Sequence, residues 1–200
     1  MYRLFDSAIS GNAYKVRLLL HKLELPVERI EMDVDDGSTR QAEFLARNPV
    51  GQVPVLQLPD GTYLAQSDAI LVYLAEGTRF WPQERLARAQ ALQWMFFEQY
   101  NHEPTIAVVR HWVAHLGKTV ASEPALPAKI AGGNRALGIM ERHLSGRDFF
   151  VGDSLTVADI ALYAYTHVAH EGGFDLGDYP AVRAWLGRVA ADPGHIAITD

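Results

Sequence analysis

The hydrophobic periodicity of this chain changes once, near residue 80, and that change most constrains its fold. Up to about residue 75, short runs with the alternating pattern of strands are separated by apolar residues at helical spacing. Beyond residue 85 only the helical spacing recurs. The pattern predicts an α/β domain over residues 1–77, a linker over residues 78–84 and an all-helical domain over residues 85–200.

The first predicted domain has the element order β-α-β-α-β-β-α. Its strands are expected at residues 2–5, 27–34, 53–58 and 63–65, and its helices after Ser10, over residues 41–47 and from Ser67 to Gly77. A strand-helix-strand unit joins its strands in parallel through a right-handed crossover. The hairpin around residues 59–62 should add two antiparallel strands to the same sheet.

The second predicted domain is a helical bundle. Its helices are expected at residues 85–116, 126–144, 157–171 and 180–191. The third of these leaves almost no polar face, which predicts a central, buried helix. Thr156 and Asp159 have the spacing of a capping box, and Leu155 and Ile160 that of its hydrophobic staple, so we interpret this segment as structural.

Composition and charge exclude several classes of protein. Hydrophobic residues make up 48% and charged residues 21% of the chain, values typical of a soluble globular protein. There are 18 Lys and Arg against 24 Asp and Glu and no basic run, which argues against nucleic acid as a partner. No segment has the ~20 apolar residues of a membrane span or the pattern of a signal peptide, so a cytoplasmic location is expected.

The chain contains no cysteine. It therefore has no disulfide and no protein thiolate, and any thiol chemistry must use a bound small molecule. His111 and His115, like His167 and His170, are spaced as helical metal pairs, but no cysteine or carboxylate partner completes either pair. We predict no metal.

The turn around Ser10 has the features of an anion site. Ser10 stands where the first helix starts, and its hydroxyl and the free N–H groups of that helix favour negative charge. Lowering a thiol pKa by about two units from ~8.5 requires about 2.7 kcal/mol. A hydrogen bond to a charged sulfur contributes roughly 1.5–3 kcal/mol and a helix terminus roughly 0.3–1 kcal/mol, so no separate base is needed. The alternative is that Ser10 only caps the helix.

Two further segments have the features of a peptide-binding site. Pro54 precedes a predicted strand, and a cis Val53–Pro54 bond would turn the Val53 backbone outward to pair with a peptide-like ligand. Gln66 and Ser67 form a polar pair at the start of another helix, suited to a carboxylate. An ordinary loop proline and a simple serine cap are the alternatives that these segments leave open.

The order and spacing of these segments resemble the cytosolic glutathione transferases along nearly the whole chain. The matching signatures are the serine turn, NPVGQVPVL at residues 48–56, QSDAI at residues 66–70 and SLTVADI at residues 154–160. The likeness is to serine-type members, related to the bacterial-like theta and nu classes. It implies a thioredoxin-like first domain, an all-α second domain, glutathione as co-substrate and a homodimer.

The resemblance also implies roles for individual residues. Ser10 would donate a hydrogen bond to the glutathione thiolate, with Asn12 as a candidate second donor. The other glutathione contacts would be Val53 before cis Pro54 for the cysteinyl backbone, Gln66 and Ser67 for the γ-glutamyl end, and Arg40 and Gln52 for the glycyl carboxylate. Tyrosine-type members use a tyrosine near the end of the first strand, whereas Tyr2 is too early and Tyr14 lies inside the helix.

In the family, the electrophile is held largely by the helical domain. The candidates in this chain are Tyr100, His102, Glu103, Arg110 and Trp112. Aromatic residues at helical spacing can equally belong to the core, and that alternative stays open.

Three functions fit these observations. The leading one is transfer of the glutathione thiolate to a small, largely apolar electrophile, a detoxification reaction. The second is reduction of a disulfide or peroxide, which must use the thiols of bound glutathione because the chain has none. The third is a non-catalytic glutathione-binding interaction module; against it, the serine turn and the glutathione-contact motifs are all intact.

Overall fold

The computed structural model describes residues 1–200 and divides them into two units. The first consists of Met1–Thr78 together with Pro193–Asp200, and the second of Arg79–Asp192. The first is an α/β unit and the second is all-helical, which confirms the predicted fold class. The predicted helical domain includes residues 193–200, whereas the structure groups them with the α/β unit, whose side chains bind their backbone carbonyls.

The sheet of the first unit has the strand order β2-β1-β3-β4. β1 (Tyr2–Asp6) pairs in parallel with β2 (Val27–Glu31), as the crossover rule predicts. β3 (Val55–Gln57) is antiparallel to β1 and to β4 (Tyr63–Ala65), so the predicted hairpin is present. β3 begins only after Pro54, because proline has no N–H to contribute to the ladder.

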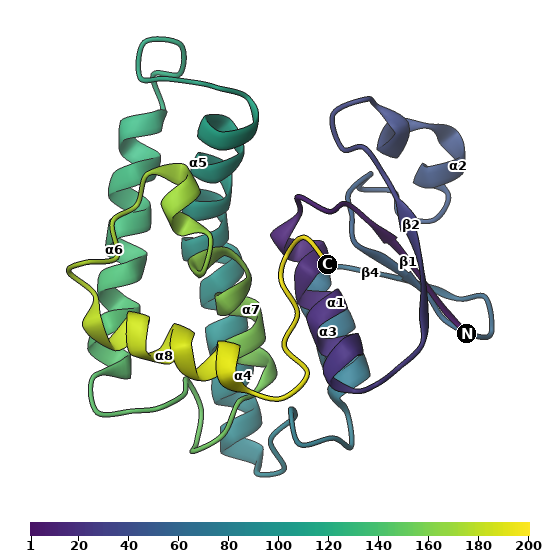
Figure 1. The fold of residues 1–200 in the computed structure, drawn as a ribbon. Helices are drawn as coiled ribbons and strands as arrows, with labels where there is room; N and C mark the ends of the chain where they lie inside the picture. Colours follow the sequence, from purple (N-terminus) through teal and green to yellow (C-terminus); the bar gives the residue numbers. More distant parts are fainter. The chain divides into compact units, whose positions relative to one another are not determined.

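Helices cover both faces of this sheet (Figure 1). α1 (Gly11–Lys22) and α3 (Ser67–Ala75) pack against each other on one face. The short η1 (Ser38–Arg40) and α2 (Ala42–Leu45) lie on the opposite face. The first unit is therefore a three-layered α/β structure.

The alternation of side chains along β1 and β3 builds the two layers of core. Phe5 and Val55 face α2, where Phe44 packs edge-on against Phe5 with ring centroids 6.1 Å apart. Leu4 and Leu56 are the neighbours of Phe5 and Val55 in their strands, so their side chains point toward the other face of the sheet, where both are fully buried. β1 and β3 are thus packed on both of their faces.

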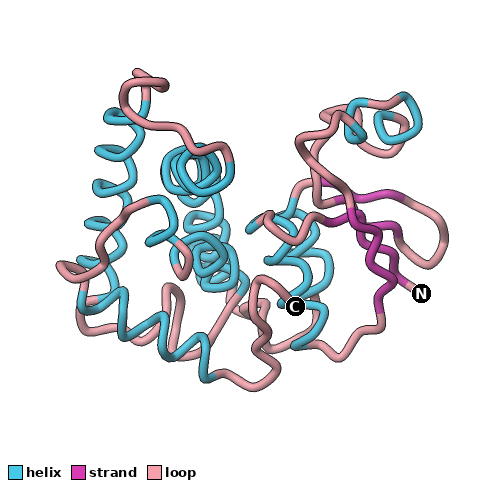
Figure 2. The backbone as a smooth tube through the Cα atoms, turned by 45° about the horizontal axis from the view of Figure 1, so that its top comes forward, coloured by secondary structure: helices cyan, strands magenta, loops and turns pink.

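The second unit is built from helices and loops (Figure 2). Its elements are α4 (Arg85–Phe97), η2 (Glu98–Ala107), α5 (Val108–Arg110), η3 (His111–His115), α6 (Leu126–Leu144), α7 (Val157–Thr166), η4 (Ala169–Gly172) and α8 (Pro180–Ala191). The first four follow one another without a break, and η2 and η3 are π-helical. Pro104 lies within η2, where a wide turn relieves the clash between its ring and the preceding turn.

α7 is the centre of the helical unit, as its apolar sequence predicts, because every residue of α7 is buried. The capping box forms between Thr156 and Asp159. Asp159 also accepts hydrogen bonds from the N–H of Phe150 and from the indole N–H of Trp185. The predicted helix over residues 157–171 is divided in the structure, since α7 ends at Thr166 and η4 follows as a separate turn.

Candidate functional site

The segments with predicted glutathione contacts meet at one end of the sheet. β1 leads into the turn of Ser10 at the end where Phe5 pairs with Val55. Because β3 is antiparallel to β1, the segment just before Val55 lies at that same end. Ala65 of β4 also pairs with Val55, so the segment after β4 starts there too. The topology thus gathers the segments of Ser10, Val53–Pro54 and Gln66–Ser67.

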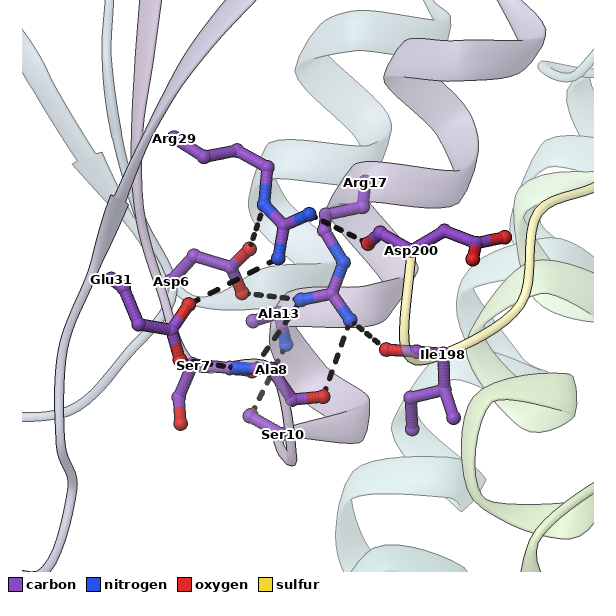
Figure 3. A network of polar contacts seen from close by, with 10 residues as sticks. All are labelled: Asp6, Ser7, Ala8, Ser10, Ala13, Arg17, Arg29, Glu31, Ile198 and Asp200. Atoms are coloured by element: carbon purple, nitrogen blue, oxygen red, sulfur yellow. Dashed lines mark hydrogen bonds and ion pairs between the residues drawn. The ribbon is translucent and has the colours of Figure 1, made fainter.

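Ser10 is the N-cap of α1 (Figure 3). Its Oγ accepts a hydrogen bond from the N–H of Ala13 at 3.2 Å, and its own N–H donates to the Ser7 carbonyl at 2.9 Å. The cap uses one lone pair of the hydroxyl oxygen, which leaves the O–H able to donate to a ligand. The capping interpretation is confirmed, and it is compatible with a role for the same hydroxyl toward an anion.

Polar contacts join the start of α1 to the start of α3. The Ser67 hydroxyl donates to Asn12 Oδ1 at 3.4 Å, so these two predicted residues are neighbours. The ammonium group of Lys15 donates to Ser67 Oγ at 3.3 Å and to Asp68 Oδ1 at 3.2 Å. The Lys15 side chain is 0% exposed. A buried positive charge therefore lies beside Ser67.

Lys15 was missed in the interpretation of the sequence. Its one local signal is its place three residues after Asn12, which puts both on the same face of α1. A lysine is ordinarily exposed, and the partner that encloses this one, Ser67, is 52 residues away in the chain. Only the folded structure brings the two together.

Gln66, at the N-cap position of α3, has an unusual backbone. Its φ of 71° and ψ of 112° lie in a region that side-chain-bearing residues rarely adopt. Such strain persists where surrounding structure imposes it, and it is frequent at ligand sites. The Gln66 side chain is exposed, whereas Ser67 is buried beside Lys15.

The Val53–Pro54 peptide bond is cis. Pro54 is buried and Val53 is half-buried. The N–H and C=O of Val53 take no part in the hydrogen bonds of the sheet or of the turns of this unit. The backbone of Val53 therefore has both of its hydrogen-bonding groups available.

Arg40 contacts the loop that contains Gln52. Its Nη1 donates to the carbonyl of Val50 at 2.8 Å. Gly51 has a φ of +67°, and a Cβ at this position would stand 2.8 Å from Arg40 Nη1 and 2.8 Å from the Thr39 carbonyl. Only glycine permits this approach. Gln52 follows Gly51 with an exposed side chain, so Arg40 contacts the loop that contains Gln52.

The five candidates for electrophile contact lie in different environments of the helical unit. Tyr100 is 85% exposed, whereas Glu103 and Trp112 are half-buried. His102 is 0% exposed, and its Nε2 lies 2.9 Å from the Thr166 hydroxyl oxygen. Arg110 is 5% exposed and pairs with Glu171 at 2.7 Å. Three of the five are thus accessible to a ligand, and two are enclosed with polar partners.

No group of three or more His, Cys, Asp or Glu side chains in residues 1–200 is arranged to bind a metal ion. The rings of His111 and His115 lie 5.9 Å apart. No helix combines the length and the apolar character needed to cross a membrane.

Family comparisons cover most of the chain. The family model described as glutathione S-transferase, N-terminal domain, matches residues 1–76. The model described as glutathione S-transferase, C-terminal domain, matches residues 95–193. The two matches lie, in this order, on the α/β and helical parts of the sequence.

Individual relatives agree with these matches. The crystal structure of a glutathione S-transferase from Pseudomonas fluorescens Pf-5 is 47% identical, covers 100% of this chain and 99% of its own, and superimposes with a TM-score of 0.97. The disulfide-bond oxidoreductase YfcG of Escherichia coli is 29% identical over 193 residues, which are 93% of this chain and 89% of that protein. The structure of yeast Ure2p in complex with glutathione is 26% identical, covers 96% of this chain and 90% of its own, and has a TM-score of 0.86. The chain therefore belongs to the cytosolic glutathione transferase superfamily.

Proposed function

We propose that this protein binds glutathione on its α/β unit and transfers the glutathione thiolate to a small, largely apolar electrophile. The observation that carries the proposal is the geometry of Ser10: its oxygen accepts from the N–H of Ala13 at the start of α1, and its O–H can still donate to a ligand. The thiolate of glutathione is the acceptor proposed for this O–H. Ser10 would thus hold the sulfur in its ionised, nucleophilic form.

The interactions proposed at Ser10 are strong enough to lower the thiol pKa without a general base. Lowering the pKa of a thiol from ~8.5 to between 6 and 7 takes about 2–3.4 kcal/mol. A hydrogen bond from Ser10 to the charged sulfur supplies roughly 1.5–3 kcal/mol, and the start of α1 adds roughly 0.3–1 kcal/mol. Asn12, one residue inside the helix, is the proposed second donor.

The rest of the tripeptide is proposed to lie across the neighbouring segments. The backbone of Val53, before Pro54, pairs with the cysteinyl residue. Gln66 and Ser67 take the γ-glutamyl carboxylate, supported by the start of α3 and by the buried charge of Lys15. Arg40 and Gln52 take the glycyl carboxylate.

The reaction forms one bond and breaks one. The thiolate sulfur attacks the electrophilic carbon, a C–S bond forms, and the leaving group departs with its electron pair; the thiol proton has already passed to solvent. The helical unit supplies the electrophile contacts, among Tyr100, His102, Glu103, Arg110 and Trp112. As the family implies, we propose a cytoplasmic homodimer that acts in detoxification.

The test titrates the ultraviolet absorbance of the thiolate of bound glutathione against pH. We expect a thiol pKa between about 6 and 7 in the native protein and a value closer to ~8.5 in Ser10→Ala. The affinity for glutathione should stay nearly unchanged, while conjugation of chlorodinitrobenzene falls at least tenfold. Ser10→Gly, which costs the helix cap only a few tenths of a kcal/mol, separates loss of the hydroxyl from loss of the cap.

Unchanged turnover in both variants would refute the role of Ser10. A native bound thiol that titrates near ~8.5 would indicate binding without activation. An absence of detectable glutathione binding would remove the assignment of the glutathione site.

A second candidate function is the reduction of disulfides, favoured by the relation to YfcG, a disulfide-bond oxidoreductase. Because this chain has no cysteine, both electrons must come from two molecules of glutathione. The first thiolate attacks the disulfide, forms a mixed disulfide and releases one thiolate; the second attacks the mixed disulfide and releases the other. Turnover of a low-molecular-weight disulfide with stoichiometric formation of glutathione disulfide would support the reductase function. If no such turnover is measured, conjugation remains the proposed reaction.

A further inference from the structure

Arg17 is a buried charge in the α/β unit, on the same helix as Ser10 and next to its turn (Figure 3). We infer that Arg17, held by the segment Pro193–Asp200, is a positioning residue for the turn that carries Ser10. The inference rests on the proposed function for its effect on catalysis, but its structural claim can be measured without any ligand.

The guanidinium group of Arg17 contacts the turn directly. Nη1 donates to Asp6 Oδ1 at 2.5 Å and to the Ser7 carbonyl at 3.4 Å, and Nη2 donates to the Ala8 carbonyl at 3.5 Å. Nη2 also donates to the Ile198 carbonyl at 2.5 Å. One planar group thus joins the end of β1, two carbonyls of the Ser10 turn and the 193–200 segment.

The opposite side of the turn is held from β2. The N–H of Ala8 donates to Glu31 Oε1 at 2.7 Å. Arg29 donates from Nε to Asp6 Oδ2 at 2.9 Å, so Asp6 is bound by two guanidinium groups. The Ser10 turn is therefore fixed through both its carbonyls and an N–H, and Asp6 links the two sides.

The 193–200 segment is bound through the carbonyls of alternate residues. Those of residues 194, 196, 198 and 200 accept, in this order, from His21 Nδ1 at 3.0 Å, the Tyr14 hydroxyl at 2.7 Å, Arg17 Nη2 at 2.5 Å and Arg29 Nη1 at 2.6 Å. Three of the four donors lie on α1 at i, i+3 and i+7, which is one face of the helix. The segment is thus held along the helix that Ser10 caps.

The chemistry of the Arg17–Asp6 ion pair favours a positioning role for Arg17 over simple stabilisation of the fold. The Arg17 and Asp6 side chains are 2% and 0% exposed, and burial lowers the pKa of Arg17 and raises that of Asp6. A buried ion pair is weak as a source of stability, because desolvation offsets the attraction. A guanidinium can, however, hold several oxygen atoms in a fixed plane, which a lysine ammonium cannot.

The first test is hydrogen exchange at single amides in the full chain, without ligand. In Arg17→Lys the charge opposite Asp6 is kept, but the fork that reaches three carbonyls is lost. We expect the amides of Ala8, Ser10 and Ala13 to exchange at least tenfold faster, while amides in β3 keep their native rates. Gly194→Val should act in the same direction, since Gly194 has a φ of +75° and a Cβ there would stand 3.1 Å from Lys22 Cα.

The second test uses glutathione and chlorodinitrobenzene. In Arg17→Lys and in Gly194→Val we expect kcat to fall about tenfold or more, because a small misplacement of a reacting group is costly, and KM for glutathione to stay within about twofold. The pKa of the bound thiol should move toward ~8.5. The double variant should be no worse than the more affected single variant, because both act through one contact.

Arg3→Met is the matched control. Arg3 lies on β1 and forms an exposed ion pair with Glu28, so its loss should change neither exchange at the turn nor turnover. If Arg17→Lys folds and its turn amides exchange as slowly as in the native protein, the positioning role of Arg17 is overturned, whether or not glutathione binds. Failure of the native protein to bind glutathione, with faster exchange in the variant, would instead overturn the proposed function alone.

Discussion

The buried carboxylate of Asp159 accepts four hydrogen bonds in the helical unit, and its removal gives a sharp test of the structure. Asp159 is 0% exposed. Oδ1 accepts from the N–H of Phe150 and from Trp185 Nε1, each at 3.0 Å. Oδ2 accepts from the N–H and the hydroxyl of Thr156, at 2.8 Å and 2.9 Å. Asp159→Ala deprives all four donors of their acceptor.

The expected loss of stability follows from these contacts. Three of the donors are fixed N–H groups, and a buried donor without an acceptor costs roughly 1–3 kcal/mol. Burial raises the pKa of Asp159 while the hydrogen bonds from Phe150, Thr156 and Trp185 oppose the shift, so relief of the buried charge offsets part of the loss. We expect Asp159→Ala to lower the free energy of unfolding by about 4 kcal/mol, a large part of the 5–15 kcal/mol typical of native proteins. For a chain of this size that corresponds to a fall in Tm of roughly 8–16 °C.

Urea unfolding followed by helical circular dichroism measures this free energy. Asp153→Ala is the matched control: Asp153 is an exposed carboxylate of the preceding loop, and its loss should change the free energy of unfolding by less than about 0.5 kcal/mol. A loss below about 1 kcal/mol in Asp159→Ala would falsify the view that this carboxylate holds α7 to its neighbours.

Two further predictions concern the buried lysine and the pH dependence of stability. Lys15→Met should raise KM for glutathione about tenfold and leave kcat within about twofold, because the charge beside Ser67 acts on binding. Steady-state kinetics measures both constants, with Lys129→Met as the control. An unchanged KM in Lys15→Met would contradict the prediction. Burial lowers the pKa of His143 below its ordinary value of 6.5, and its ring stacks on Phe150. The unfolded chain therefore takes up a proton that the folded chain does not, and stability present above pH 6.5 is lost as the pH falls through that value toward the lowered pKa. Urea unfolding at several pH values should show this slope in the native protein and a smaller one in His143→Phe; equal slopes would contradict the assignment.

Local features of this protein were predictable because their partners are close in sequence. The capping of α1 by Ser10 and the Thr156–Asp159 box each join residues three apart, and helix geometry alone brings such residues together. The change of periodicity near residue 80 likewise predicted an α/β part followed by a helical part. The order of the glutathione-contact segments was enough to place the chain in its family.

The contacts that complete the site were decided by the tertiary structure. Lys15 reaches Ser67 across 52 residues, and Arg17 reaches Ile198 across 181. No local pattern distinguishes these two cations from exposed ones, because long charged side chains are enclosed only when other elements close over them. The same holds for Pro193–Asp200, which follows the last helix in sequence but binds to α1. Hydrogen bonds at short sequence separation follow from helix and turn geometry, whereas these depend on which surfaces the folded chain brings together.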